Sequence, residues 1–94
     1  MFGQINKISV VPEKREEVIR LILSGSEGMP GCLSYVVAAD EADENTVWVT
    51  EIWETSESHA ASLNLPKVKA AIEAAMLMIK GFENVATTSP KIAG

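Results

Sequence analysis

The chain has a single cysteine among its 94 residues, so it cannot form an intramolecular disulfide. A protein without disulfides fits a reducing compartment, and we expect a cytoplasmic location. One cysteine and one histidine also cannot supply the four ligands of a common Cys/His zinc site. The sequence lacks both an apolar run of about 18 residues and the basic start of a signal peptide. We therefore expect neither a membrane span nor a secretory leader.

Basic residues are scarce, with eight Lys and Arg against 13 Asp and Glu and a net charge of −5 at pH 7. That charge repels a nucleic-acid backbone or an anionic membrane surface, and we expect neither as a partner. Hydrophobic residues at 47% and charged residues at 22% are ordinary for a globular domain. We expect one domain over 1–94, with its core at about 4–88 and a short C-terminal tail.

Hydrophobic periodicity predicts strands and helices along most of the chain. The predicted strands cover 4–11, 32–39, 46–53 and 82–88, and the acidic segment 40–45 forms a solvated hairpin loop. One helix starts at Pro12 and ends near Gly25, a short helix capped by Thr55 or Ser56 runs to Leu63, and a longer one runs from Pro66 to Gly81. The order β-α-β-β-α-β predicts a ferredoxin-like α+β fold, an antiparallel sheet with helices on one face.

The strand predicted at 46–53 carries apolar side chains on both of its faces. One face holds Val47, Val49, Glu51 and Trp53, and the other holds Trp48, Thr50 and Ile52. A sheet face that meets water would alternate with clearly polar residues. The face without helices is therefore a dimer interface, a ligand cavity or both.

His59 is the candidate general base, because histidine is the side chain whose unperturbed pKa lies near neutrality. The alternative for His59 is an exposed helix residue. Asn6 places an amide among aliphatic side chains, so it needs a polar partner or a ligand unless it lies near an exposed strand end. Trp53 forms an aromatic wall for a flat substrate or packs in the core.

Three further residues are candidates for substrate binding. Tyr35 donates its hydroxyl to a ligand or caps the core at a barrel rim. Trp48 faces away from Trp53, where core packing is the simpler role, and Met76 lies on the periodic face of the predicted long helix. Leu77 and Met78 fall off that face, and exposed apolar residues there fit a subunit contact. Cys32 has no cationic neighbour in the sequence and is expected to be buried and inert.

An ordered series of short segments runs through the middle of the chain: Pro30-Gly31-Cys32-Leu33-Ser34-Tyr35, Glu51-Ile52-Trp53-Glu54, Ser56-Glu57-Ser58-His59, Ala61-Ser62-Leu63, Leu65-Pro66 and Ile79-Lys80-Gly81-Phe82. This series resembles the antibiotic-biosynthesis-monooxygenase-like family, in particular its quinol monooxygenase subgroup. Many relatives carry a histidine where Ser62 and Lys67 stand here. Close look-alikes often have a Gly-Arg-Pro segment where Ala75-Met76-Leu77 stands here, so this chain lacks a cation that could stabilise an oxyanion.

The resemblance implies a homodimer in which two sheets pack face to face as a dimeric α+β barrel. It also implies an apolar pocket between sheet and helices, where a quinol- or anthrone-like aromatic reacts with O₂ without a cofactor. His59, Asn6 and Trp53 are then the catalytic candidates. The alternatives are a haem-binding or haem-degrading protein of the same superfamily with His59 at the iron, a non-enzymatic dimeric binding module for small molecules, and an isomerase that needs no oxygen.

Overall fold

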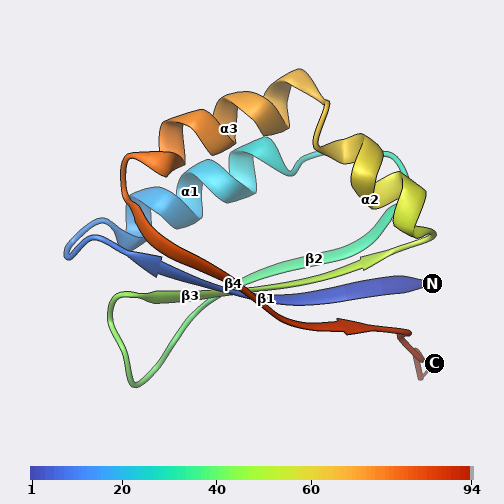
Figure 1. The fold of residues 1–94 in the computed structure, drawn as a ribbon, viewed down its shortest axis with the longest axis horizontal. Helices are drawn as coiled ribbons and strands as arrows, with labels where there is room; N and C mark the ends of the chain where they lie inside the picture. The colour runs from blue at the N-terminus through green and yellow to red at the C-terminus, as the bar shows by residue number, and fades with distance from the viewer. Residues whose placement is uncertain (94) are drawn as a thin grey trace.

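Strands rich in β-branched residues form one antiparallel sheet, and three helices cover one face of it (Figure 1). The computed structural model describes residues 1–93, of which 89–93 carry no helix or strand. The elements are β1 (Phe2–Val10), α1 (Arg15–Gly25), β2 (Cys32–Ala39), β3 (Thr46–Trp53), α2 (Ser56–Ser62), α3 (Pro66–Met76) and β4 (Ile79–Thr88). The strand order is β2-β3-β1-β4, which confirms the predicted ferredoxin-like α+β fold.

The first helix begins later than predicted. Glu13 has a φ of 71°, in the left-handed region that a right-handed helix cannot include. The amide of Lys14 bonds to the carbonyl of Val11, so Pro12 lies in a tight turn and not in the first helical turn. The predicted start at Pro12 was wrong because this turn separates β1 from α1.

The last helix ends earlier than predicted. α3 stops at Met76, and Gly81, the predicted end, lies inside β4. Pairing of β1 with β4 already includes Val10 and Ile79, so the sheet takes residues that helical periodicity had assigned to the helix. Along α3 only Ala75 is buried.

The apolar core lies between the sheet and α1. Its fully or nearly buried members are Ile8, Val10, Val18, Val47 and Val49. Partly buried residues pack against this cluster, and Met78 is one of them, contrary to the expectation that it is exposed. Leu77, by contrast, is 89% exposed. No helix of the described residues is both long enough and apolar enough to cross a membrane.

The sheet face that carries no helix is lined by a mixture of apolar and polar side chains. Trp48 lies there, half-buried, with its indole N–H donating to Oδ2 of Asp40 over 2.7 Å. This hydrogen bond is the main reason that the pKa of Asp40 is lowered. The ammonium group of Lys7 lies 5.8 Å from the Trp48 ring centroid. Asp40 also accepts the backbone amides of Ala42 and Asp43, as a solvated hairpin loop requires.

Candidate functional site

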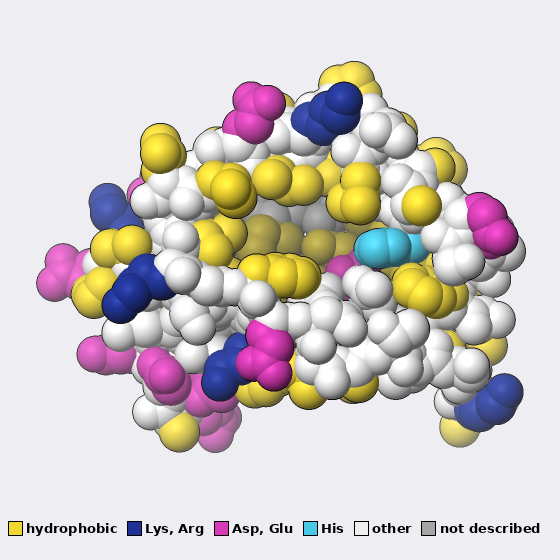
Figure 2. Space-filling view, in the orientation of Figure 1, with side chains coloured by type: hydrophobic (Ala, Val, Ile, Leu, Met, Phe, Trp, Pro, Cys, Tyr) yellow, Lys and Arg dark blue, Asp and Glu magenta, His cyan; other side chains and the backbone are white. Residues whose placement is uncertain are grey.

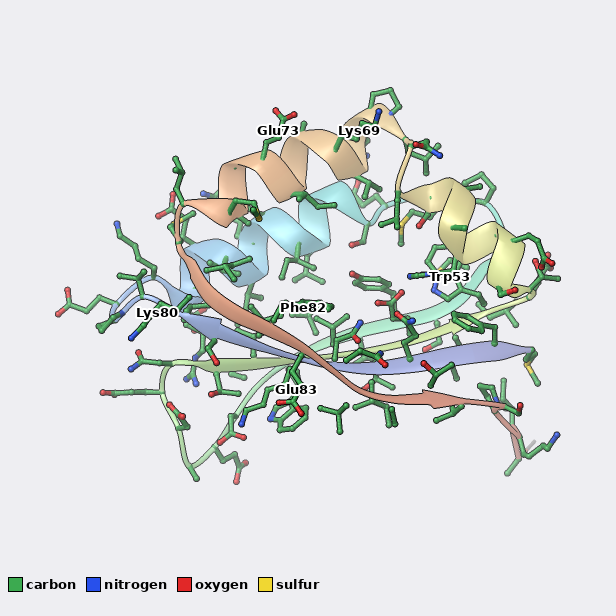
Figure 3. The ribbon with its side chains drawn as sticks, in the orientation of Figure 1. Trp53, Lys69, Glu73, Lys80, Phe82 and Glu83 are labelled. Carbon is green, nitrogen blue, oxygen red and sulfur yellow. The ribbon has the colours of Figure 1, made fainter. Side chains whose placement is uncertain are left out.

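A hollow opens between α3 and the sheet, and hydrophobic side chains surround most of it (Figure 2). The single histidine of the chain lies at one end of this hollow. On the edge strand β4, Phe82 points to the helix side and Glu83 to the opposite side (Figure 3). Phe82 is 64% exposed, which leaves an apolar ring at the surface on the side of the helices.

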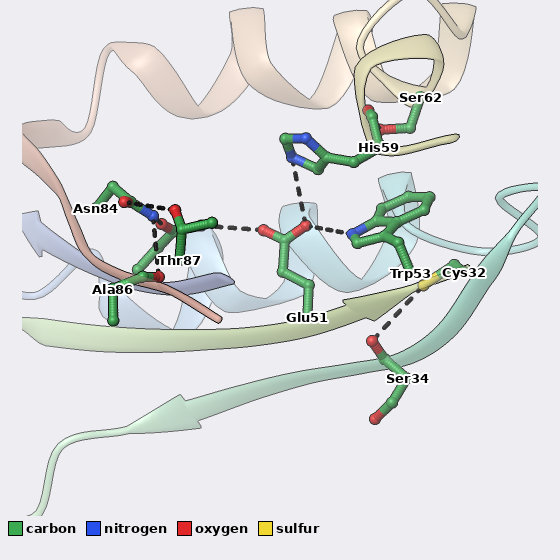
Figure 4. Close-up of polar contacts among 10 residues, drawn as sticks. Cys32, Ser34, Glu51, Trp53, His59, Ser62, Asn84, Ala86 and Thr87 are labelled. Carbon is green, nitrogen blue, oxygen red and sulfur yellow. Dashed lines mark hydrogen bonds and ion pairs between the residues drawn. The ribbon is translucent and has the colours of Figure 1, made fainter. Parts of the chain in front are cut away.

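A buried carboxylate defines the polar end of the hollow. Glu51 of β3 is 6% exposed. Its Oε1 accepts the indole N–H of Trp53 over 2.8 Å, and its Oε2 accepts the amide N–H of Asn6 over 3.0 Å (Figure 4). Strand alternation places Glu51 and Trp53 on the helix-covered face, and Asn6 reaches the same face from β1.

His59 of α2 lies next to this carboxylate. Its Nε2 is 3.6 Å from Oε1 of Glu51, too long for a hydrogen bond but within ion-pair distance. The ring centroid of His59 is 5.4 Å from that of Phe2 and 5.5 Å from that of Trp53, which it meets edge-on. Thr55 begins α2 by accepting the amide of Ser58, which fixes the helix that carries the imidazole.

The edge strand β4 extends the polar cluster to the surface. The amide N–H of Asn84 donates to Oδ1 of Asn6 over 2.8 Å, and Oδ1 of Asn84 accepts the hydroxyl of Thr87 over 3.3 Å (Figure 4). A shift in the β1–β4 register between Ile5 and Asn6 leaves Asn84 directly opposite Asn6. Asn84 itself is exposed, so the cluster runs from solvent to the buried carboxylate.

Tyr35 of β2 pairs with Glu51 across the sheet and packs against the apolar core. Burial, and then the charge of Glu51, raise the pKa of Tyr35 to about 12. The hydroxyl therefore stays protonated and able to donate at neutral pH. The thiol of Cys32 is half-buried, and burial raises its pKa as well, which keeps it in the weakly reactive thiol form.

The structure brings three of the predicted site residues together and separates two others. His59, Asn6 and Trp53 meet around Glu51. Trp48 lies on the opposite face of the sheet, and Met76 is 63% exposed on α3. These two side chains do not join the cluster.

Sequence reasoning missed Glu51 and Asn84. Glu51 carried a usable signal, because it is the one charged residue on the otherwise apolar face of its strand. Asn84 carried no such signal, since its place opposite Asn6 depends on the register shift in β4.

The family model for antibiotic biosynthesis monooxygenases matches residues 1–74. The chain belongs to the antibiotic biosynthesis monooxygenase family. A solved structure of a candidate member from Chloroflexus aurantiacus is 40% identical, with a TM-score of 0.94 over 99% of this chain and 95% of that one.

Two further proteins are similar to this chain. A candidate monooxygenase from Deinococcus radiodurans is 22% identical, covers 99% of this chain and 95% of its own, and shares the fold with a TM-score of 0.81. An uncharacterized protein of Synechocystis is 39% identical over 49 residues, which is 49% of this chain. That match spans 33% of the Synechocystis protein, about a third of its length.

One position of the site, Ser62, departs from the pattern that the family resemblance implies. Ser62, where many relatives are expected to carry histidine, is buried, and its hydroxyl donates to the backbone carbonyl of His59 over 2.6 Å. The residue at this position thus supports the helix that carries His59.

Within residues 1–93, no group of three or more His, Cys, Asp or Glu side chains is arranged to hold a metal ion.

Proposed function

We propose that this chain is a cofactor-independent monooxygenase that oxidises a quinol- or anthrone-like aromatic with O₂. The observation that carries the proposal is the position of His59, beside the carboxylate of Glu51 and against two aromatic rings. Family membership supports the reaction class. Deprotonation of a weakly acidic substrate requires a base, which the site supplies. The largely apolar surroundings of this base suit a flat substrate.

The reaction begins with proton transfer to the imidazole of His59. For an anthrone, a C–H bond breaks, an N–H bond forms on the ring, and the electron pair stays on the substrate as a delocalised anion. This anion reacts with O₂, and the imidazolium returns its proton to give a hydroperoxide. Loss of the second C–H proton then cleaves the O–O bond and releases water. In sum, CH₂ and O₂ become C=O and H₂O, so the substrate itself is the reductant.

The neighbouring side chains serve this step in different ways. Phe2 is half-buried, packs against the imidazole and forms an apolar wall for the substrate ring. Trp53 is only 1% exposed, so it supports His59 and Glu51 from within the core and does not contact the substrate. Asn6 uses its amide N–H on Glu51 and its carbonyl on Asn84. We therefore assign Asn6 to the support of the carboxylate and not to contact with the substrate.

The haem alternative requires an iron ligand, and His59 is the only histidine of the chain. Its Nε2 faces Oε1 of Glu51 at 3.6 Å. An iron bound at Nε2 would occupy the space of that carboxylate. These residues do not fit an axial haem ligand through Nε2, and we derive no step through haem.

A homodimer is part of the proposal. The helix-free sheet face carries exposed Val36 and half-buried Ile5, Trp48 and Ile52. A second copy of this chain packed on that face would remove this apolar surface from water. We also place the reaction in the cytoplasm, because a half-buried lone thiol suits a reducing compartment.

The test measures oxygen uptake by the chelator-treated protein with a panel of quinols and hydroxyanthrones. We expect saturable uptake above the protein-free rate, and a loss in kcat of about 10²- to 10⁴-fold in His59→Ala, the usual contribution of a general base. The unfolding transition of this variant should stay cooperative, since α2 keeps its cap. Glu57→Gln is the matched control, because it alters an exposed side chain of the same helix and should leave uptake unchanged.

Two results would contradict the proposal. Equal uptake by His59→Ala and the parent protein would remove the histidine from the reaction. Absence of uptake with every substrate, together with saturable binding of the same aromatics, would instead support a dimeric binding module.

A further inference from the structure

Glu51 is the acceptor in both hydrogen bonds that its side chain makes. Both of its carboxylate oxygens accept, one from Trp53 and one from Asn6. The indole N–H can only donate, so Trp53 fixes the direction of its own bond. The direction of the Asn6 bond depends on which end of the amide faces Glu51.

Two neighbours fix the orientation of that amide: the carboxylate of Glu51, which can only accept, and Asn84. Its side-chain N–H donates to Oδ1 of Asn6 over 2.8 Å, so the carbonyl end of Asn6 faces β4 and the NH₂ end faces Glu51. The backbone carbonyl of Ala86 can only accept, and it orients Asn84 in turn by accepting its side-chain N–H over 3.4 Å. The Thr87 hydroxyl then donates to Oδ1 of Asn84 over 3.3 Å. The order Thr87, Asn84, Asn6, Glu51 is therefore a chain of donors that ends on the carboxylate, from the exposed edge strand inward.

This arrangement determines where neutral His59 carries its proton. Nε2 of the imidazole lies 3.6 Å from Oε1 of Glu51. A carboxylate oxygen attracts an N–H and repels a nitrogen lone pair, so the proton on Nε2 is the favoured arrangement. The other nitrogen, Nδ1, then holds the free lone pair. Contacts of the ring with Phe2 and Trp53 oppose its rotation.

We propose that Asn84, Asn6 and Glu51 act as positioning residues that hold the neutral imidazole of His59 in the Nε2–H form and leave Nδ1 as the atom that takes the substrate proton. In this step the substrate O–H or C–H bond breaks, an Nδ1–H bond forms, and the electron pair stays on the substrate. Glu51 faces the imidazolium that results. The tautomer itself requires no reaction, whereas the role of Nδ1 rests on the proposed function.

The tautomer can be read directly from nitrogen-15 NMR of the resting protein at a pH where the ring is neutral. The chain has a single histidine, so one set of ring signals appears. We expect the Nε2–H form to exceed the Nδ1–H form by about tenfold or more in the parent protein, which corresponds to about 1.4 kcal/mol. Glu51→Gln should reduce this ratio by about tenfold or more, because a glutamine amide can donate to Nε2.

Asn84→Ala provides a second variant in case the buried substitution prevents folding. Asn84 is exposed, so its loss should leave the fold intact while removing one of the two hydrogen bonds that orient the Asn6 amide. We expect the tautomer ratio to fall in this variant too. Glu83→Gln is the control, since Glu83 pairs with Lys7 and not with Asn6, and its side chain points away from the helices (Figure 3). The tautomer ratio of this variant should equal that of the parent protein.

A dominant Nδ1–H form in the parent protein would overturn the inference. So would a ratio that stays unchanged in every foldable variant of Glu51 and Asn84. Oxygen uptake separates this failure from that of the proposed function. Uptake without the expected tautomer refutes only the positioning role, and the expected tautomer without uptake refutes only the monooxygenase. If the tautomer and the oxygen uptake are both as expected, Glu51→Gln lowers kcat by about 10²-fold or more with little change in KM.

Discussion

Tyr35 is the only tyrosine of the chain, so its ionisation can be followed by the absorbance of the phenolate alone. Burial first and the charge of Glu51 second raise its pKa from 10.0 to about 12. We expect the folded protein to titrate near that value and the urea-unfolded protein near 10. Glu51→Gln should lower the folded midpoint, because it removes the second cause and leaves the first.

The same shift predicts how stability changes with pH. The folded state holds the phenolic proton more tightly than the unfolded state, so the contribution of Tyr35 is fully present below about pH 10. It is lost progressively as the pH rises from about 10 through about 12. Chemical unfolding at several alkaline pH values measures this loss in the parent protein and in Tyr35→Phe. If the free energy of unfolding changes with pH by the same slope in the two proteins, Tyr35 does not contribute.

Single residues also show how far the sequence predicts the site. His59, Asn6 and Trp53 could be named from residue type and face, and the structure brings them together. Trp48 could be placed on the opposite face by strand alternation alone. The contact of Asn84 with Asn6 could not be predicted, because one irregularity in pairing changes which side chains face each other.

At the scale of elements, the packing of α1 on α3 depends on Gly25, the last residue of α1. A Cβ added there would come within 2.5 Å of the Cβ of Ala71 on α3. We expect Gly25→Ala to lower the free energy of unfolding by about 1 to 3 kcal/mol, since overpacking outweighs the gain in helix propensity. Urea unfolding measures this change.

Gly81→Ala is the matched control for this substitution. A Cβ there would meet nothing nearer than the Cβ of Ser9 at 3.9 Å, an ordinary contact. Its effect should be close to neutral or slightly stabilising, because glycine weakens a strand interior. The double variant Gly25→Ala with Ala71→Gly should be more stable than the sum of the two single changes predicts, because it removes the contact between the two Cβ atoms. Equal destabilisation at positions 25 and 81 would mean that contact with α3 is not the cause.

Element ends were the least predictable part of the fold. The strands β2 and β3 have the predicted bounds, because turn residues mark both ends of each. The start of α1 and the end of α3 were wrong for a common reason. Each lies beside β1, whose ladder and following turn take up residues that local periodicity assigns to a helix.

At the scale of the whole molecule, element order alone was enough to predict the fold, since short connections leave few ways to arrange these strands and helices.

The outer face of the sheet and the helix side each carry an exposed apolar side chain. Val36 is 53% exposed on this face in the single chain. Leu77 is 89% exposed on the helix side. Both are candidates for a subunit contact, and they lie on opposite sides of the molecule.

The proposed dimer predicts that a charge at one of these positions, and not at the other, disrupts assembly. Val36→Glu places a carboxylate halfway along the edge strand β2, on the face that we expect a second copy to cover, and burying it unpaired is costly. We expect the dimer dissociation constant to rise by about tenfold or more, measured by sedimentation across a range of concentrations. Leu77→Glu should leave it unchanged. A parent protein that is monomeric at every concentration would refute the dimer, and disruption by Leu77→Glu alone would move the contact to the helix side.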